Sequence, residues 1–198
     1  MRIGIYGGTF DPVHFGHLLA AEQCREQCSL DEVWFVPAAT PPHKTTKNIS
    51  PGENRAEMLE LAIAGHSYFR VDRRELDREG YSYTVDTLTD IHDVEPTHEL
   101  FLLLGGDSVI DFETWREPVK ILQFATLVAV NRGRAPLDLT SFRRRFGEAG
   151  EQRLLCIEMP AIDVSATDIR NRVRDGRSIR FMTPRGVEEY INEHRLYR

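Results

Sequence analysis

The sequence predicts an α/β fold in which an open, mainly parallel twisted sheet carries helices on both faces. Short β-rich segments alternate with helical patterns along the chain, and this is the order that right-handed βαβ units produce. Several of the β-rich segments are almost continuously apolar, as strands covered on both faces should be. Ligands of such sheets bind beyond the carboxyl ends of the strands, so functional residues are expected there.

The strands are predicted from short apolar segments rich in β-branched or aromatic residues. They are Arg2–Tyr6, Glu32–Val36, Phe69–Asp72, Glu99–Leu104, Ala125–Asn131 and Arg153–Met159. The helices are predicted from the helical patterns that lie between and after these strands. They are Phe15–Cys28, Pro51–Ala64, Thr84–Asp93, Pro118–Gln123, Leu139–Ala149, Ala166–Arg174 and Pro184–Leu196.

Start signals support three of these helices. The segment 50–53, Ser-Pro-Gly-Glu, reads as a capping box with proline at the first helical position. Ser165 and Asp168 form a weaker acidic version of the same box, and Thr183-Pro184 opens the last helix.

A long loop, residues 37–50, lies before the second predicted helix and contains two prolines and two lysines within residues 41–47. It is interpreted either as a partly stiffened flap that faces phosphate or as a solvated surface loop.

Length and charge bound the function. A chain of 198 residues predicts one domain, residues 1–198. The net charge of −6 argues against binding to nucleic acid or to an anionic membrane through bulk charge. The charge is uneven, because residues 1–130 carry 11 basic and 21 acidic side chains, whereas residues 131–198 carry 14 arginines and 10 acidic side chains.

Cysteine usage and hydropathy indicate the compartment. Cys24, Cys28 and Cys156 form an odd set without a C-x-x-C pair, so a disulfide framework is not expected and a reducing compartment is favoured. No apolar run approaches the roughly 18 residues of a membrane helix, and the first residues lack a secretory apolar core. We therefore expect a cytoplasmic protein.

The first strand runs into the segment GGTFDPVHFGH, residues 7–17. The two glycines allow the backbone to turn and to approach a ligand closely. His14 and His17 share one face at a helix start, where N–H groups and the helix dipole favour an anion. Phosphate binding is favoured over a zinc site, which would have too few ligands, and over ordinary capping or packing histidines. Neither a dinucleotide fingerprint nor a P-loop is present.

A second helix start carries Ser165, Thr167 and Arg170 within the segment VSATDIR, residues 164–170. Hydroxyls and a guanidinium can all donate to phosphate oxygens. Alone, this pattern is equally typical of an ordinary cap and a solvated arginine. Together, the two segments predict two helix N-termini that face one polyphosphate.

These segments, with PPHK at 41–44, GYSYTVDTL at 80–88, Gly106-Asp107-Ser108 and Trp115, resemble the bacterial nicotinate-nucleotide adenylyltransferase family. This is a branch of the HxGH nucleotidyltransferases, and the resemblance covers essentially the whole chain in order. It implies a Rossmann-like sheet and transfer of the adenylyl group of ATP to nicotinate mononucleotide, with Mg²⁺ held mainly by phosphates. One departure is Ala166, where the family usually has serine.

The implied chemistry needs no protein nucleophile. The phosphate of a mononucleotide is already ionised near neutral pH, so it can attack the α-phosphorus of ATP in line, without a general base or a covalent intermediate. Catalysis then consists of aligning two anions and stabilising charge. The resemblance places the catalytic role on His14 and His17, with His17 as the main stabiliser at the α-phosphate.

The resemblance also implies which residues bind each substrate. ATP would be bound by Gly7, Gly8, Thr9, Phe10, His14, His17, Asp107, Ser165, Thr167 and Arg170. The mononucleotide would be bound by Thr9, Lys44, Tyr83, Thr84, Asp107, Trp115 and Arg132.

Alternatives stay open for several of these residues and for the function. Trp115 is either a stacking surface for a pyridine ring or a packing residue, and Asp107 is either a ligand of the nucleotide or a helix cap. Arg143–Arg145 is interpreted as a solvated helix face. Other functions are an HxGH transferase with a nicotinamide-mononucleotide or pantetheine-phosphate acceptor, or a nucleotide-binding module without turnover. A homo-oligomer is compatible with each of these.

Overall fold

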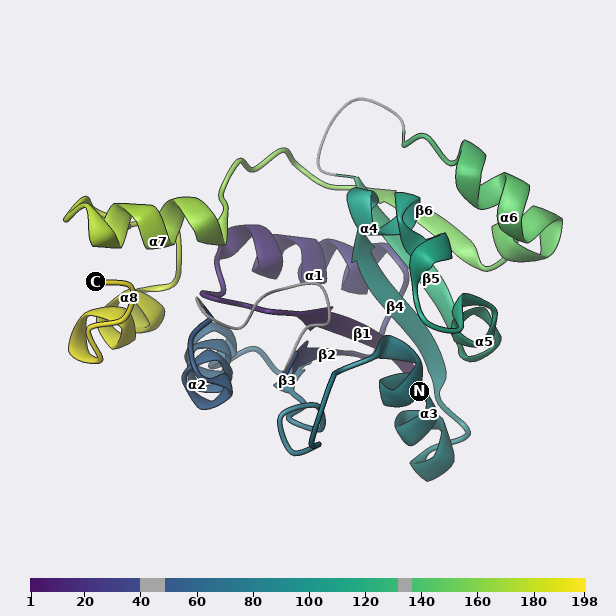
Figure 1. The fold of residues 1–198 in the computed structure, drawn as a ribbon, viewed down its shortest axis with the longest axis horizontal. Helices are drawn as coiled ribbons and strands as arrows, with labels where there is room; N and C mark the ends of the chain where they lie inside the picture. The colour runs from purple at the N-terminus through teal and green to yellow at the C-terminus, as the bar shows by residue number, and fades with distance from the viewer. Residues whose placement is uncertain (40–48, 132–136) are drawn as a thin grey trace.

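The computed structural model describes residues 1–39, 49–131 and 137–198 (Figure 1). Within these ranges the strands form one sheet in the order β3-β2-β1-β4-β5-β6, and every pair is parallel. The predicted mainly parallel sheet is therefore confirmed. The strands are β1 (Arg2–Gly8), β2 (Glu32–Pro37), β3 (Phe69–Val71), β4 (Glu99–Gly105), β5 (Ala125–Asn131) and β6 (Leu154–Glu158).

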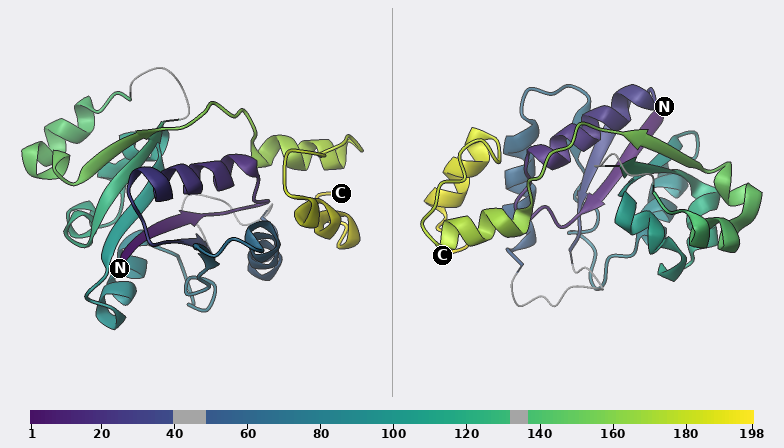
Figure 2. Two further views of the ribbon diagram at one scale, coloured as in Figure 1. Left: turned by 180° about the vertical axis from the view of Figure 1, so that it is seen from behind. Right: turned by 90° about the horizontal axis from the view of Figure 1, so that it is seen from above.

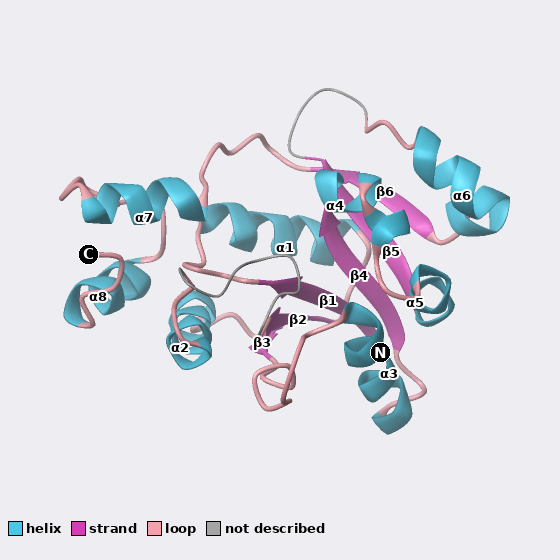
Figure 3. Ribbon diagram, viewed as in Figure 1, coloured by secondary structure: helices cyan, strands magenta, loops and turns pink. Residues whose placement is uncertain are grey.

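The predicted helices are all present, and Figure 3 separates them from the strands by colour. They are α1 (Phe15–Gln27), α2 (Gly52–Ile63), α3 (Thr84–Val94), α5 (Pro118–Phe124), α6 (Thr140–Glu151), α7 (Ala166–Arg174) and α8 (Arg185–Glu193). Two short elements were not predicted, because one turn of helix is too short to show a hydrophobic period. They are α4 (Gly106–Ile110) and the 3₁₀ turn η2 (Phe112–Thr114).

Helices cover both faces of the sheet, as predicted (Figure 2). Successive residues of a strand point to opposite faces, so Val128 of β5 belongs to one core and Leu127 and Ala129 belong to the other. The first core includes buried residues of α1, α2, α7 and α8, and the second includes those of α3, α5 and α6. Burial on both faces explains the continuous apolar runs of the inner strands.

Two of the three predicted helix starts are corrected by tertiary contacts. Pro51 is the N-cap residue of α2, and Ser50 instead donates its backbone N–H to Oδ2 of Asp11 at 3.1 Å. Pro184 is the N-cap of α8, while the Thr183 hydroxyl donates to the carbonyl oxygen of Val13 at 2.8 Å. A partner distant in the sequence has replaced the local cap in both cases.

The third start is confirmed. The Ser165 hydroxyl oxygen accepts a hydrogen bond from the backbone N–H of Asp168 at 3.1 Å and so caps α7. The Asp168 carboxylate does not complete a capping box, because it pairs with Arg172 one turn later at 2.8 Å.

The cysteines are free, as the sequence predicts. Cys24 and Cys28 are buried in α1 and at its end, and burial raises the pKa of both thiols. Cys156 lies exposed on β6. Within residues 1–39, 49–131 and 137–198, no helix has both the length and the apolar character needed to cross a bilayer.

The strand order places a topological switch between β1 and β4. The chain runs from β1 outward to β2 and β3 on one side, and then returns to β4 and continues to β5 and β6 on the other. Connections that diverge from two neighbouring strands leave a crevice at their carboxyl ends, where open α/β sheets bind ligands.

Candidate active site

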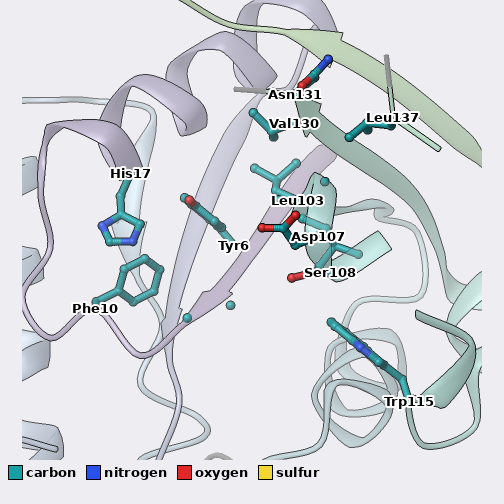
Figure 4. A pocket seen from close by; sticks show the side chains of 15 residues that line it. Tyr6, Phe10, His17, Leu103, Asp107, Ser108, Trp115, Val130, Asn131 and Leu137 are labelled. Atoms are coloured by element: carbon teal, nitrogen blue, oxygen red, sulfur yellow. The ribbon is translucent and has the colours of Figure 1, made fainter. Parts of the chain in front are cut away.

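A cavity of about 550 Å³ lies at the carboxyl ends of β1, β4 and β5 (Figure 4). A Cβ atom added to Gly7 of β1 or to Gly105 of β4 would meet no heavy atom within 4 Å. Both glycines therefore keep space open at the switch point. The wall is formed by Tyr6, Gly7, Gly8, Phe10, His17, Leu103, Leu104, Gly105, Gly106, Asp107, Ser108, Trp115, Val130, Asn131 and Leu137.

The turn after β1 is shaped by Phe10. Its backbone is left-handed, with φ at 49°, although its side chain is buried; such a conformation persists only where packing enforces it. The Phe10 ring packs 5.5 Å from the ring centroid of Tyr6 and 5.1 Å from that of His17. A Cβ on Gly8 would lie 2.9 Å from the Phe10 ring, so the second glycine of the motif is needed for this packing.

His14 and His17 stack at the start of α1, with ring centroids 3.7 Å apart. The backbone N–H of His14, the N-cap residue, donates to Nδ1 of His17 at 3.2 Å. Because Nδ1 accepts, the neutral His17 ring carries its proton on Nε2 and can donate it to a ligand. A Cβ on Gly16 would lie 3.1 Å from the His14 ring, which is why glycine stands between the histidines.

The two histidines differ in their access to the cavity. His17 forms part of its wall, and Figure 4 shows the ring beside Phe10. His14 is only 3% exposed and does not form the wall. His17 is thus the imidazole that can contact a ligand in the cavity, and the buried His14 ring packs against it.

Residues at and just before α7 contact the segment around the start of α1. Arg170 donates to the carbonyl oxygen of Asp11 at 2.6 Å and lies 3.3 Å from the Thr167 hydroxyl oxygen. Ile162, just before α7, packs near Gly16 of α1. Arg170 thus contacts the first motif directly and Thr167 lies beside Arg170, while Ser165 caps α7; none of the three forms the cavity wall.

Asp107 belongs to α4 and lies on the side of the cavity opposite His17 (Figure 4). Gly105 is the N-cap residue of that helix, so the interpretation of Asp107 as a helix cap was wrong. Figure 4 shows the Asp107 side chain facing the space in front of β1. A carboxylate there can accept from hydroxyls of a nucleotide or bind a hydrated cation.

A second pocket, of about 390 Å³, shares Trp115 with the wall of the first. Tyr83 and Thr84, at the start of α3, form its wall together with Arg116. The Arg116 guanidinium lies 4.6 Å from the centre of the Tyr83 ring. Trp115 also packs 5.5 Å from Phe112 of the core, so it is both a packing residue and a free surface between two pockets.

Glu75 is a supporting residue that the sequence did not reveal. It is 7% exposed and accepts a hydrogen bond from the Thr87 hydroxyl at 2.6 Å. Burial raises the pKa of its carboxyl, against hydrogen bonds from Thr87 and Ser82. Ser82 also accepts from the backbone N–H of Ala39 and forms part of the second pocket. The residues around Glu75, 72–79, are nearly all charged, so no local pattern distinguishes Glu75 as the buried one.

The remaining predicted residues lie outside the described ranges, on an exposed part of α6 or beside the cavity wall. Lys44, Arg132 and most of the predicted flap lie outside the described residues. Arg143–Arg145 is an exposed stretch of α6, which confirms the solvated face, and Arg143 pairs with Glu151. Thr9 adjoins the cavity wall without forming it. Among the residues that the structure describes, no three His, Cys, Asp or Glu side chains are grouped as metal ligands.

Comparisons with known proteins show the family to which the chain is similar. A family profile described as cytidylyltransferase-like matches residues 5–172. The chain is similar to a "Probable nicotinate-nucleotide adenylyltransferase" of Thermus thermophilus, with 46% identity over all of both chains. A protein of the same name from Roseiflexus sp. is 45% identical over 99% of this chain and 98% of its own.

A solved structure shares the fold. The Plasmodium falciparum nicotinic acid mononucleotide adenylyltransferase complexed with NaAD has a TM-score of 0.79 and 21% identity, and the match covers 99% of this chain and 97% of that one.

Proposed function

This chain belongs to the cytidylyltransferase-like family and, within it, to the nicotinate-nucleotide adenylyltransferases, and we propose that it transfers the adenylyl group of ATP to nicotinate mononucleotide. The products are deamido-NAD and pyrophosphate, which makes the reaction a step of NAD biosynthesis. One observation carries the proposal: Trp115 borders both the cavity at His17 and the pocket at Tyr83 and Thr84. A triphosphate beside His17 and a pyridine ring beside Trp115 would then be neighbours.

The triphosphate side of the site would stabilise charge. His17 would donate Nε2–H to the α-phosphate, in the orientation that its hydrogen bond from His14 imposes. Gly7, Gly8 and Phe10 would form the wall against which the nucleotide lies. The acceptor phosphate would attack in line, and the residues around it need only hold the two anions in place.

The start of α7 would hold the β- and γ-phosphates. Ser165 caps the helix through its oxygen, so its O–H remains a donor, and Thr167 supplies a second hydroxyl. Arg170, already within hydrogen-bond distance of Thr167 and the turn after β1, would add the charge. These groups would have to make up for the hydroxyl that is missing at Ala166.

The second pocket favours an acid over its amide. Trp115 would stack on the pyridine ring, while the start of α3 at Tyr83 and Thr84 offers backbone N–H groups to a ring carboxylate. The Arg116 guanidinium, which lies 3.5 Å from an Asp86 carboxylate oxygen and 3.8 Å from one of Glu117, would bring a cation to the same wall. Thr9, Lys44 and Arg132 would complete the binding of the mononucleotide and its phosphate.

Magnesium would enter with ATP. The described part of the chain offers the Asp107 carboxylate in the cavity but no cluster of three ligands, and this donor set fits an ion held mainly by phosphate oxygens and water. When bound, Mg²⁺ neutralises charge on the leaving pyrophosphate. We also propose that residues 1–198 act as one nucleotidyltransferase domain in the cytoplasm.

A pyrophosphate-release assay with ATP and Mg²⁺ tests the function. Nicotinate mononucleotide should be turned over faster than nicotinamide mononucleotide, and phosphopantetheine should not react. Equal or reversed preference would contradict the acceptor, whereas turnover of phosphopantetheine would indicate another transferase of this superfamily. ATP binding by calorimetry without any pyrophosphate release would indicate a binding module instead.

A further inference from the structure

The turn that carries the first motif is held by the last residues of the chain. Asp11 is 3% exposed, and its Oδ1 accepts a hydrogen bond from the Tyr197 hydroxyl at 2.6 Å. Its Oδ2 accepts from the backbone N–H of Ser50 at 3.1 Å. The C-terminus lies beside α7 (Figure 1), which brings Tyr197, residue 197 of 198, to the turn after β1.

Two arginines also hold this turn in place, through hydrogen bonds to backbone carbonyl oxygens. Arg55 of α2 is 1% exposed and donates to the carbonyl oxygens of Thr9 at 2.8 Å and Ser50 at 3.0 Å. Arg170 of α7 donates to the carbonyl oxygen of Asp11. Buried charges are tolerated only when they are paired and hydrogen-bonded, so Asp11 and Arg55 depend on these partners staying in place.

The C-terminal tail, residues 195–198, has a strained backbone. Arg195 and Tyr197 both have left-handed backbones, with φ at 52° and 66°. Such conformations are costly for residues other than glycine and persist where tertiary contacts impose them. Burial and the Asp11 carboxylate both raise the pKa of the Tyr197 hydroxyl, so it remains a hydrogen-bond donor at neutral pH.

The geometry of this turn decides where His17 lies. Asp11 is adjacent to Phe10, whose ring packs on His17. Three residues further along, the backbone of His14 holds Nδ1 of His17. A displacement of the turn would therefore tilt the imidazole, and small errors in such a group are expensive because transition-state contacts require accurate positions.

We propose that Tyr197 is a positioning residue, which sets the orientation of the His17 imidazole through its hydrogen bond to Asp11. The catalytic consequence rests on the adenylyl transfer proposed above. The tail, α2 and α7 thus all donate hydrogen bonds to the turn after β1 or to Ser50 beside it, and this turn is fixed from three distant parts of the chain.

The test compares two variants that each remove one phenolic hydroxyl. Tyr197→Phe removes the hydrogen bond to Asp11 together with the contact to the Ser50 side chain. Tyr190→Phe is the matched control, because Tyr190 is 8% exposed on α8, and its hydroxyl contacts Asn54 and Glu57 of α2 instead of the turn. Thermal unfolding of both variants measures the loss of stability that they share.

The first readout is turnover. Tyr197→Phe should lower kcat about tenfold, as expected for a lost hydrogen bond to a charged group, with KM for nicotinate mononucleotide within about twofold of wild type. Tyr190→Phe should keep kcat within about twofold. An equal loss of kcat in both variants, or an unchanged kcat in Tyr197→Phe, would overturn the proposal.

The second readout needs no substrate. In ¹⁵N spectra of the histidine rings, the His17 signals should shift in Tyr197→Phe and remain in place in Tyr190→Phe. Unchanged His17 signals in Tyr197→Phe would overturn the positioning role even if the wild type is active. If the His17 signals shift but the wild type releases no pyrophosphate from nicotinate mononucleotide, the proposed function fails and the positioning role stands.

A further variant covers the case in which Tyr197→Phe does not fold. Asp11→Asn keeps an oxygen for the Tyr197 hydroxyl but removes the charge and places an amide toward Ser50. It should shift the His17 signals in the same way, and unchanged signals would count against the proposal.

Discussion

The backbone N–H of His14 donates to Nδ1 of His17 at 3.2 Å, and this bond decides which nitrogen of the His17 ring can act as a donor. Two histidines three residues apart thus have unequal tasks. His14 is buried and orients its neighbour, whereas His17 forms part of the cavity wall.

Replacing His17 by alanine should therefore remove the donor without unfolding the chain. We expect kcat to fall by about 10²–10³-fold, the usual cost of losing a charge-stabilising donor, while the circular dichroism spectrum and the unfolding temperature stay close to wild type. His194→Ala, an exposed histidine after α8, is the control. Near-normal turnover of His17→Ala would remove the assigned role.

Gly7 and Gly8 should respond differently to substitution. Gly7→Val points its side chain into open space, so it should raise KM for ATP at least about tenfold by filling the cavity, with little change in the unfolding temperature. Gly8→Ala must displace the Phe10 ring, since its Cβ would lie 2.9 Å away, and should lower kcat and stability together. Steady-state kinetics and calorimetry distinguish the two patterns, and identical behaviour would contradict the cavity geometry.

Arg116 should contribute to the choice between acid and amide. Arg116→Gln removes positive charge from the wall of the second pocket, so we expect the ratio of kcat/KM for nicotinate over nicotinamide mononucleotide to fall about tenfold, or about 1.4 kcal/mol. Lys120→Gln removes a charge from α5 and serves as the control. A ratio that changes equally in both variants would show that only the net charge matters.

Glu75 should make stability depend on pH. Because burial raises its pKa in the folded state, the unfolded chain releases this proton at a lower pH than the folded chain does. The contribution of Glu75 to the free energy of unfolding is complete below the ordinary carboxyl pKa and is lost as the pH rises toward the raised pKa. Glu75→Gln should flatten this decline and be at least as stable as wild type at neutral pH.

Urea unfolding across this pH range measures the effect. Glu79→Gln, an exposed neighbour, should keep the wild-type slope. The same slope in Glu75→Gln would show that the carboxyl of Glu75 does not titrate differently on folding.

The sequence by itself determined the strands, the longer helices and the two segments at the starts of α1 and α7. Apolar runs such as Leu100–Leu104 and helix-start patterns such as Ser165–Asp168 are local properties, so the strands and α7 follow from residues close together in the chain. The glycines and histidines of residues 7–17 are equally local, and their spacing predicted that His14 and His17 share one face at a helix start.

Only the tertiary structure decided which distant groups support that site. Ser50 had the pattern of a helix cap but binds Asp11 instead, and Tyr197 reaches the same carboxylate across 186 residues. Glu75 is buried although its neighbours are charged. Hydrogen-bond partners of buried polar groups are chosen by proximity in the folded chain, and no local pattern records that proximity.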